Sequence, residues 1–119
     1  MNVFKFGGAS VKDAQGVKNV ATVLQQTGHS NLVIVVSAMG KMTNALEGVV
    51  NCYFQEPAKV KQAIEDIKAY HWSISKEIFT DLNAPVFRQI QTLITTLSSF
   101  LQTNKSINQA YVYDQVVGY

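Results

Sequence analysis

The residues best suited to chemistry lie at the start of the sequence. Lys5 is followed after one residue by a glycine pair, Gly7 and Gly8, and Ser10 comes shortly afterwards. Glycines let backbone N–H groups approach a ligand closely, and the N-terminus of a following helix attracts negative charge. The Lys5 ammonium adds a mobile cation that can reach the same anion. This pattern predicts a phosphate-binding turn, although the same residues could form a tight turn beside a solvated lysine.

A second stretch of small and flexible residues follows an apolar segment and runs from 37 to 44. It carries hydroxyl groups at Ser37 and Thr43, with Gly40 between them. Ligands of open α/β sheets lie beyond the carboxyl ends of the strands, so we expect the two glycine-containing loops to meet at one crevice. Ser37 and Thr43 could equally serve as turn and cap residues, and Lys41 could be a solvated loop lysine.

The elements that must position these loops follow from the apolar pattern. Residues 2–6 are expected to form a short strand, and 11–26 an amphipathic helix with Ser10 as its N-cap and Gly28 just beyond its end. After a turn at 29–31, the continuously apolar segment 32–36 predicts a parallel strand buried on both faces. Strand, helix and strand together make a βαβ unit, and the fold class is α/β.

The rest of the chain has helical spacing. A helix is expected to begin after a cap at Thr43 or Asn44, and Pro57 is expected to open one long helix through residue 78. Another helix starts at 85, and a Ser106–Gln109 capping box predicts a last one up to about 117. The sequence predicts no third strand, so the sheet is expected to be incomplete.

Composition narrows the possible functions. The chain has 119 residues, a size that fits one domain, and its net charge of +2, with scattered basic residues, gives no indication of nucleic-acid binding. Cys52 is the only cysteine, which excludes an internal disulfide and favours a reducing cytoplasm. The longest apolar run, 32–36, is far too short for a membrane span. The histidines, His29 in a turn and His71 on an apolar helix face, form no metal pair, so we predict no protein metal site.

The two loops together resemble those of aspartate kinases, members of the amino-acid-kinase superfamily. The family pattern Lys-Phe-Gly-Gly-Thr-Ser is matched by residues 5–10 except at Ala9, and a Val-Ser-Ala run leading into Thr-Asn is matched at residues 36–38 and 43–44. A weaker similarity lies at 114–118. The resemblance implies the opening part of a three-layer α/β/α amino-acid-kinase fold, with an incomplete sheet.

The resemblance also implies the chemistry. ATP would phosphorylate the β-carboxylate of L-aspartate, with Mg²⁺ bridging the phosphates, as the first step towards lysine, threonine and methionine. Lys5 would be the catalytic cation, with Gly7, Gly8, Ser10 and Gly40 around the phosphates and Ser37 and Thr43 on the substrate side. Such a reaction needs positioned cations and N–H donors more than a protein nucleophile, and a carboxylate acceptor needs no general base.

The resemblance covers only the opening portion of a kinase domain. The Gly-Glu pair, a substrate arginine, the base pocket and the regulatory ACT domains of the family have no counterpart in residues 1–119. We therefore expect a fragment that is inactive alone. Two alternatives stay open: a helical assembly module, and another member of the superfamily, such as a kinase for glutamate, carbamate or a nucleoside monophosphate. Exposed apolar helix stripes would favour a homo-oligomer.

Overall fold

The computed structural model describes residues 2–28 and 30–119 and divides the chain into two compact units, Met1–Met42 and Thr43–Tyr119. The predicted turn residue His29 lies outside the described residues. Each unit is described separately below. None of the helices in the described part of the chain is long and apolar enough to cross a membrane.

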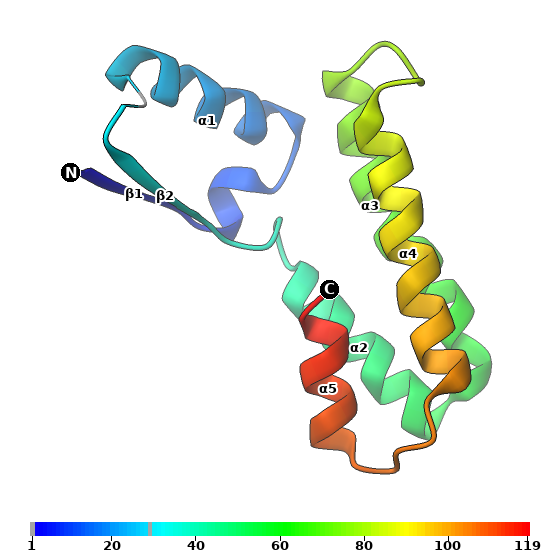
Figure 1. Ribbon diagram of the computed structural model, residues 1–119. Coiled ribbons are helices and arrows are strands. Elements are labelled where there is room, and N and C mark those ends of the chain that lie inside the picture. Colours follow the sequence, from blue (N-terminus) through cyan, green and yellow to red (C-terminus); the bar gives the residue numbers. More distant parts are fainter. Residues whose placement is uncertain (1, 29) are drawn as a thin grey trace. The chain divides into compact units, whose positions relative to one another are not determined.

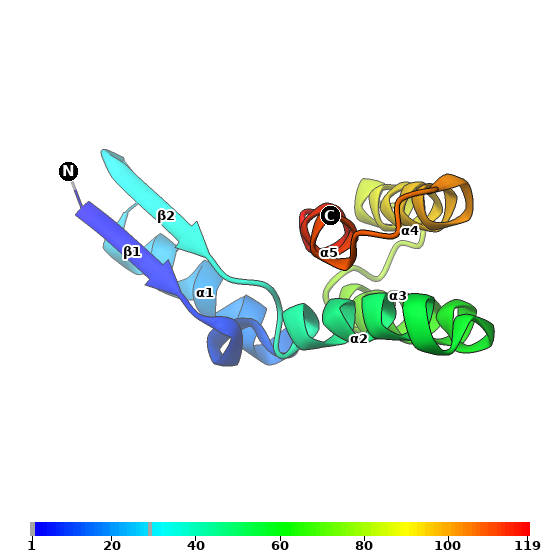
Figure 2. The same cartoon turned by 90° about the horizontal axis from the view of Figure 1, so that it is seen from below.

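The first unit contains the predicted strand–helix–strand arrangement. Strand β1 spans Asn2–Phe6, helix α1 spans Ala14–Thr27, and strand β2 spans Leu32–Val36. The strands pair in parallel and side by side, with Lys5 opposite Val35 and Phe6 opposite Val36 (Figures 1 and 2). Within the described residues they form a sheet of two strands, which agrees with the predicted incomplete sheet.

The start of α1 differs from the prediction. Residues Gly8–Val11 form a 3-10 turn, η1, and the α-helix begins only at Ala14. Its N-cap is Asp13, whose Oδ1 accepts a hydrogen bond of 2.8 Å from the N–H of Gly16. Ser10 is therefore not the cap. The Asp13 carboxylate stabilises the N-terminus of α1 because it accepts from a helical N–H that has no partner within the helix, whereas the Ser10 hydroxyl lies too early in the chain to do so. Gly28 ends the helix as predicted, with a φ of 77°.

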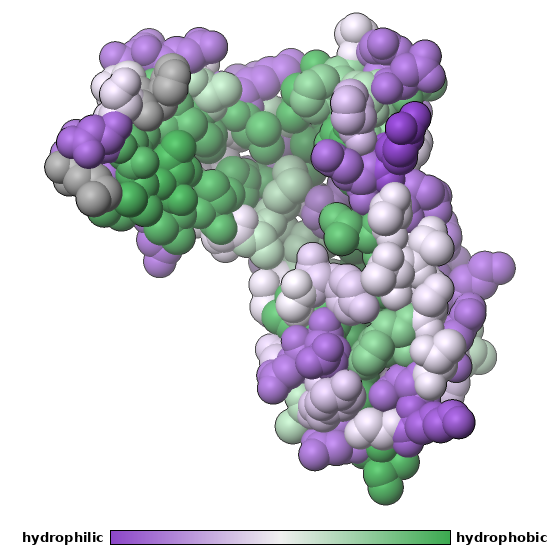
Figure 3. Space-filling view, viewed as in Figure 1, coloured by the Kyte–Doolittle hydropathy of each residue, from purple (hydrophilic) through white to green (hydrophobic). Residues whose placement is uncertain are grey.

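The sheet is more exposed than its apolar sequence predicted. Val3 and Val35 are 65% and 45% exposed, and the remaining residues of β2 are at best half-buried. Side chains alternate along a strand, so Val3, Lys5, Val33 and Val35 share one face of the sheet, the valine face. The prediction that β2 is buried on both faces is thus wrong for this chain. Figure 3 shows hydrophobic residues gathered over the strands.

The second unit is helical. It contains helix α2 (Met42–Gln55, beginning at the unit boundary), a 3-10 turn η2 (Pro57–Lys59), and helices α3 (Val60–Ile78), α4 (Pro85–Thr103) and α5 (Gln109–Val117). Its core residues are buried on the inner helix faces. They are Val49, Val50, Ile64, Ile67, Ile74, Phe87, Leu97, Leu101, Val112 and Val116. In the first unit, by contrast, the buried hydrophobic residues are Val11 and Ala14.

Three helix starts in this unit differ from the prediction. Helix α2 begins at Met42, so Thr43 lies inside its first turn and does not cap it. Pro57 opens the 3-10 turn η2, whose Lys59 pairs with Glu56 at 2.6 Å, and the hydrogen bond and charge of Glu56 raise the pKa of Lys59. The last helix is capped by Asn108, whose side chain accepts from the N–H of Tyr111 at 3.2 Å, so the predicted Ser106–Gln109 capping box is wrong. An amide one residue before the helix competes successfully with the earlier serine.

A small hydrogen-bond network joins α2 to the connection between α4 and α5. The Asn104 amide donates to Tyr53 Oη at 3.1 Å and to the carbonyl of Ser106 at 3.1 Å. In return, the Asn104 Oδ1 accepts from the Ser106 N–H at 3.2 Å, and Tyr53 Oη donates to the Asn104 carbonyl at 3.3 Å. The network is half-buried, and its hydrogen bonds link the α4–α5 connection to α2 through Tyr53 and to itself through Ser106.

Trp72 and His71 of α3 contact neighbouring groups in the helical unit. Trp72 and Phe87 lie with ring centroids 4.8 Å apart, and the Lys68 ammonium lies 5.5 Å from the Trp72 ring. His71 Nδ1 lies 2.9 Å from the carbonyl oxygen of Ile67, one turn earlier. His71 is thus a half-buried side chain with a backbone partner in its own helix.

Candidate phosphate-binding site

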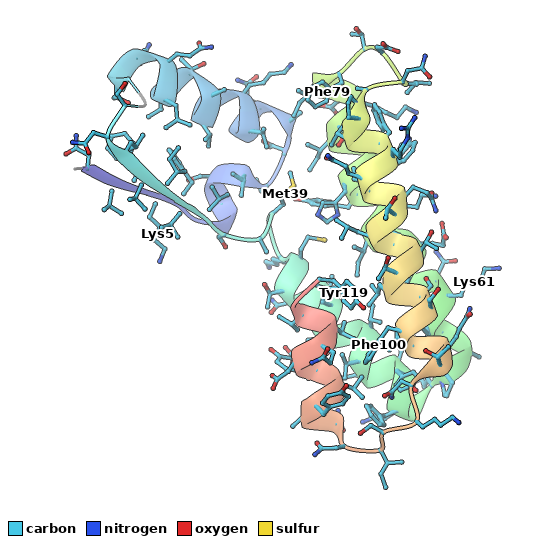
Figure 4. The ribbon with its side chains drawn as sticks, viewed as in Figure 1. Lys5, Met39, Lys61, Phe79, Phe100 and Tyr119 are labelled. Carbon is cyan, nitrogen blue, oxygen red and sulfur yellow. The ribbon has the colours of Figure 1, made fainter. Side chains whose placement is uncertain are left out.

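Lys5 lies near the carboxyl end of β1 on the valine face of the sheet. Its side chain is exposed and points away from α1 (Figure 4). The neighbouring Phe6 is on the opposite face, where it lines a hollow together with Val20 and Val23 of α1. Among the described residues none forms an ion pair with the Lys5 ammonium. The charge is therefore available for an anion at this end of the strand.

The turn after β1 presents backbone donors. The Ser10 N–H donates to the carbonyl of Gly7 at 3.0 Å and closes η1. Within the described part of the chain, the N–H groups of Gly7, Gly8 and Ala9 donate to no carbonyl or side-chain oxygen. Successive N–H groups without a protein acceptor, shortly after a lysine in the chain, are candidate donors to an anion. These donors come from the 3-10 turn, whereas the first turn of α1 is already capped by Asp13.

The second loop joins the first directly beyond the sheet. The Ser37 N–H donates to the Phe6 carbonyl at 2.9 Å, and the Gly40 N–H donates to the Gly8 carbonyl at 3.1 Å. The ladder between the strands thus continues into the loops. Gly40 has a φ of 55°, a left-handed conformation that glycine adopts readily. The predicted meeting of the two glycine loops is confirmed for Gly8 and Gly40.

The three predicted site residues that carry hydroxyl groups are all exposed. Ser10 is exposed in η1, and Ser37 is exposed directly after β2. Thr43 is exposed in the first turn of α2, which belongs to the second unit. The first unit therefore contains Lys5, Gly7, Gly8, Ser10, Ser37 and Gly40, and among these residues backbone hydrogen bonds join Gly8 to Gly40 and Gly7 to Ser10. The ligand contact predicted for Thr43 stays a prediction.

A hollow of about 370 Å³ lies on the α1 side of the turn. Its lining includes Phe6, Ser10, Asp13 and Val20, but neither Lys5 nor Gly40. Its wall carries both a lysine and a carboxylate, Lys12 and Asp13, and it also includes Ala9 of the turn. We place the candidate anion site at the turn donors next to Lys5, because the hollow does not include Lys5.

Two contributors were missing from the sequence-based site. Asp13 fixes the start of α1, and the pairing of Gly8 with Gly40 fixes the two loops against each other. Asp13 has a sequence signal, because an aspartate before a helical stretch is a common N-cap. The glycine pairing has none, since it depends on the parallel register of residues far apart in the chain.

The chain's donor set suits a nucleotide-bound metal ion better than a protein-held one. In residues 2–28 and 30–119, no three His, Cys, Asp or Glu side chains gather into a metal cluster. Mg²⁺ usually keeps several waters and takes one or two protein groups plus substrate phosphates. The exposed hydroxyls of Ser10 and Ser37 are compatible with an ion that arrives on the phosphates.

Comparison with known proteins gives consistent results. A model of the amino acid kinase family matches residues 1–114. Aspartokinase 1, chloroplastic, of Arabidopsis thaliana is 37% identical over 83 residues, covering 66% of this chain and 14% of the relative. The aspartokinase of Chlamydia trachomatis is 34% identical over 89 residues, covering 74% of this chain and 19% of the relative. The chain thus spans less than a fifth of the length of these curated relatives.

A solved structure shares the fold. Escherichia coli aspartokinase III, crystallised in complex with aspartate and ADP, aligns with a TM-score of 0.79 and 22% sequence identity. The alignment covers 99% of this chain and 25% of that one. Both units thus match the start of a known α/β fold, which confirms the predicted fold class.

Proposed function

Since the chain belongs to the amino acid kinase family, we propose that it forms the N-terminal part of the catalytic domain of an aspartate kinase. The observation that carries this proposal is the joined pair of loops, in which unengaged N–H groups lie beside Lys5 and the Gly40 N–H donates to Gly8 at 3.1 Å. The aspartokinase names of the relatives that are more than 30% identical favour aspartate over other acceptors.

In this proposal the turn holds the phosphates of ATP. The N–H groups of Gly7, Gly8 and Ala9 donate to phosphate oxygens, and the Lys5 ammonium approaches the γ-phosphoryl group on which charge develops during transfer. The Ser10 hydroxyl and Gly40 lie around the phosphates. A Mg²⁺ ion bound to the nucleotide would supply charge neutralisation on the phosphates, next to the hydroxyl of Ser10.

The acceptor is the β-carboxylate of L-aspartate, and Ser37 and Thr43 contribute hydroxyl groups on its side. The carboxylate oxygen attacks the γ-phosphorus as the bond to the β–γ bridging oxygen breaks, which gives 4-phospho-L-aspartate and ADP. No proton must be removed from the acceptor, so the site needs no general base. The product leads towards lysine, threonine and methionine, and we place the protein in the cytoplasm on the basis of its single cysteine.

Nucleotide binding by the 119-residue chain can be measured directly. Titration with MgATP, followed by amide NMR, should shift the resonances of residues 5–10 and 37–40 and leave those of α4 unchanged. The chain alone should give no aspartate-dependent acyl phosphate above background in a hydroxamate assay, because it spans less than a fifth of the length of its aspartokinase relatives. Absence of any shift at millimolar MgATP would contradict the proposed phosphate site.

A chimera tests the acceptor. Residues 1–119 should replace the aligned quarter of Escherichia coli aspartokinase III, to which they correspond over 99% of this chain. The chimera should form the hydroxamate with aspartate and not with glutamate, and Lys5→Met should abolish turnover. A chimera carrying Lys18→Met, an exposed lysine of α1, is the matched control and should stay active. Equal loss in both variants would contradict the role of Lys5.

A further inference from the structure

We propose that Gly8 is a positioning residue whose missing side chain lets the second loop dock on the phosphate turn, while Gly7 is the glycine that leaves room for the anion. This assigns different tasks to the two glycines of the pair. The inference rests on the proposed function for its ligand, a polyphosphate, but the docking of the loops can be measured without it.

The surroundings of Gly8 leave no room for a side chain. A Cβ atom placed on Gly8 would lie 2.6 Å from the carbonyl oxygen of Gly40 and 3.3 Å from that of Ala38. Both neighbours are backbone atoms, which cannot swing away as a flexible side chain would. An alanine at this position must therefore push the second loop away from the turn and lengthen the 3.1 Å hydrogen bond from the Gly40 N–H to the Gly8 carbonyl.

Gly7 has the opposite surroundings. A Cβ atom on Gly7 would meet nothing within 4 Å. Its φ of −77° and ψ of 176° are ordinary extended values that any residue adopts. The fold itself thus tolerates a side chain at Gly7. In the proposed arrangement the anion approaches through this open space at Gly7, which a methyl group would occupy.

The docked loop also orients the turn. The Gly8–Ala9 peptide is trans and planar, so the direction of the Gly8 carbonyl determines the direction of the Ala9 N–H. The Gly40 N–H holds that carbonyl, and the Ala9 N–H is one of the donors without a protein acceptor. Gly8 therefore acts on the ligand through Gly40 and Ala9, by fixing a donor in place before the anion arrives.

The experiment uses the full chain, with two readouts for each of three variants. Amide hydrogen exchange at Gly40 reports the docking of the loops, and calorimetric titration with inorganic tripolyphosphate reports anion binding. Gly8→Ala should reduce both Gly40 protection and tripolyphosphate affinity by about tenfold or more, as expected for loss of a hydrogen bond and of a positioned donor. Gly7→Ala should keep Gly40 protection and reduce affinity alone.

Gly48→Ala is the matched control. Gly48 lies in α2, and a Cβ atom there meets nothing within 4 Å, so neither readout should change. The assignment is overturned if Gly8→Ala keeps Gly40 protected, or if Gly7→Ala exposes Gly40 to the same extent. Protection of the β2 amides shows whether the first unit still folds in each variant.

Two variants of Gly40 test the docking of the loops if Gly8→Ala unfolds the first unit. Gly40 has a φ of 55°, which asparagine tolerates and a β-branched residue does not. Gly40→Asn should keep the amide of residue 40 protected from exchange, whereas Gly40→Val should lose that protection; equal protection in both variants would overturn the docking role. If the unmodified chain binds no tripolyphosphate but Gly8→Ala still exposes Gly40, the proposed function fails and the docking stands.

Discussion

At the scale of single residues, Lys5 is unusual for its position in the strand. It shares the valine face of the sheet with Val3, Val33 and Val35, at the end that leads into the turn. Its aliphatic stem can lie along the valines while the ammonium reaches beyond the strand end. A cation held in this way can follow a phosphoryl group over a short distance, which a guanidinium fork would do less easily.

The charge of Lys5 should account for a large share of anion affinity. Lys5→Met keeps the stem and removes the charge, so tripolyphosphate affinity should fall by about tenfold or more, in line with loss of a charge-assisted hydrogen bond. Calorimetric titration measures the change, and Lys5→Arg should retain part of the affinity. Lys18→Met removes an exposed lysine of α1 and should bind as the unmodified chain does. Equal affinities for Lys5→Met and Lys18→Met would contradict the prediction.

At the scale of elements, the start of α1 depends on Asp13. Asp13→Ala removes the acceptor of the 2.8 Å bond from Gly16 and should lower the free energy of unfolding of the first unit by about 1 kcal/mol. Asp13→Asn keeps a capping oxygen and should lower the free energy of unfolding by only about a few tenths of a kcal/mol. Urea unfolding followed by the β2 amides measures both. If the two variants lose the same stability, the effect comes from charge and not from the cap.

The connection between α4 and α5 depends on the Tyr53–Asn104 network. Asn104→Ala removes the amide that donates to Tyr53 Oη and to the Ser106 carbonyl, and the Oδ1 that accepts from the Ser106 N–H. The bond from Tyr53 Oη to the backbone carbonyl of residue 104 stays, so the variant should cost about 1–3 kcal/mol of the free energy of unfolding of the helical unit, mainly through the Ser106 backbone groups. Tyr53→Phe should cost about 1 kcal/mol. Tyr111→Phe, on an exposed tyrosine, is the control and should be near neutral. Chemical unfolding followed by circular dichroism gives the values.

The elements of this chain were predictable where one strong local signal acts. Three elements were observed with nearly the predicted bounds. They are β2, predicted from the apolar run 32–36, α3, predicted from the helical spacing of 60–78, and α4, predicted to start at Pro85. The strand, glycine pair and lysine also led to the candidate site, because the parallel register places the two loop ends together. The family resemblance added the expected substrate.

Helix starts were less predictable because neighbouring residues compete to cap them. Asp13 displaces Ser10, and Asn108 displaces Ser106, since in each case the later side chain accepts from a helical N–H. The exposure of β2 was also mispredicted. An apolar strand indicates that both faces are suited to burial, but the burial itself requires covering layers that this sheet does not receive from the described residues.

At the scale of the whole molecule, most of the buried core belongs to the helical unit. Its fully buried side chains are Val49, Val50, Val112 and Val116, whereas the first unit buries Val11 and Ala14 and leaves its valine face exposed. Exposed apolar faces of this kind are typical of surfaces that bind another polypeptide. The helical unit also exposes Ile107, Leu82 and Leu93.

These exposed surfaces should make the chain associate with itself. Sedimentation velocity should show species larger than a monomer that increase with protein concentration, because association removes apolar surface from water. Val35→Lys places a second charge on the valine face beside Lys5 and should shift the distribution towards monomer. Lys18→Met should not, as it lies on the exposed side of α1. A stable monomer at high concentration would contradict the prediction and remove support for a homo-oligomer.

The first unit is one continuous segment of the chain, so the residues of the anion turn are inherited together. Lys5, both turn glycines and Gly40 all lie within the compact unit Met1–Met42, and the bond that joins the loops is internal to it. A single recombination breakpoint after this unit therefore transfers the lysine, the donors and their fixed geometry together. We expect gene fusions and truncations in this region to keep or lose the anion turn as a whole.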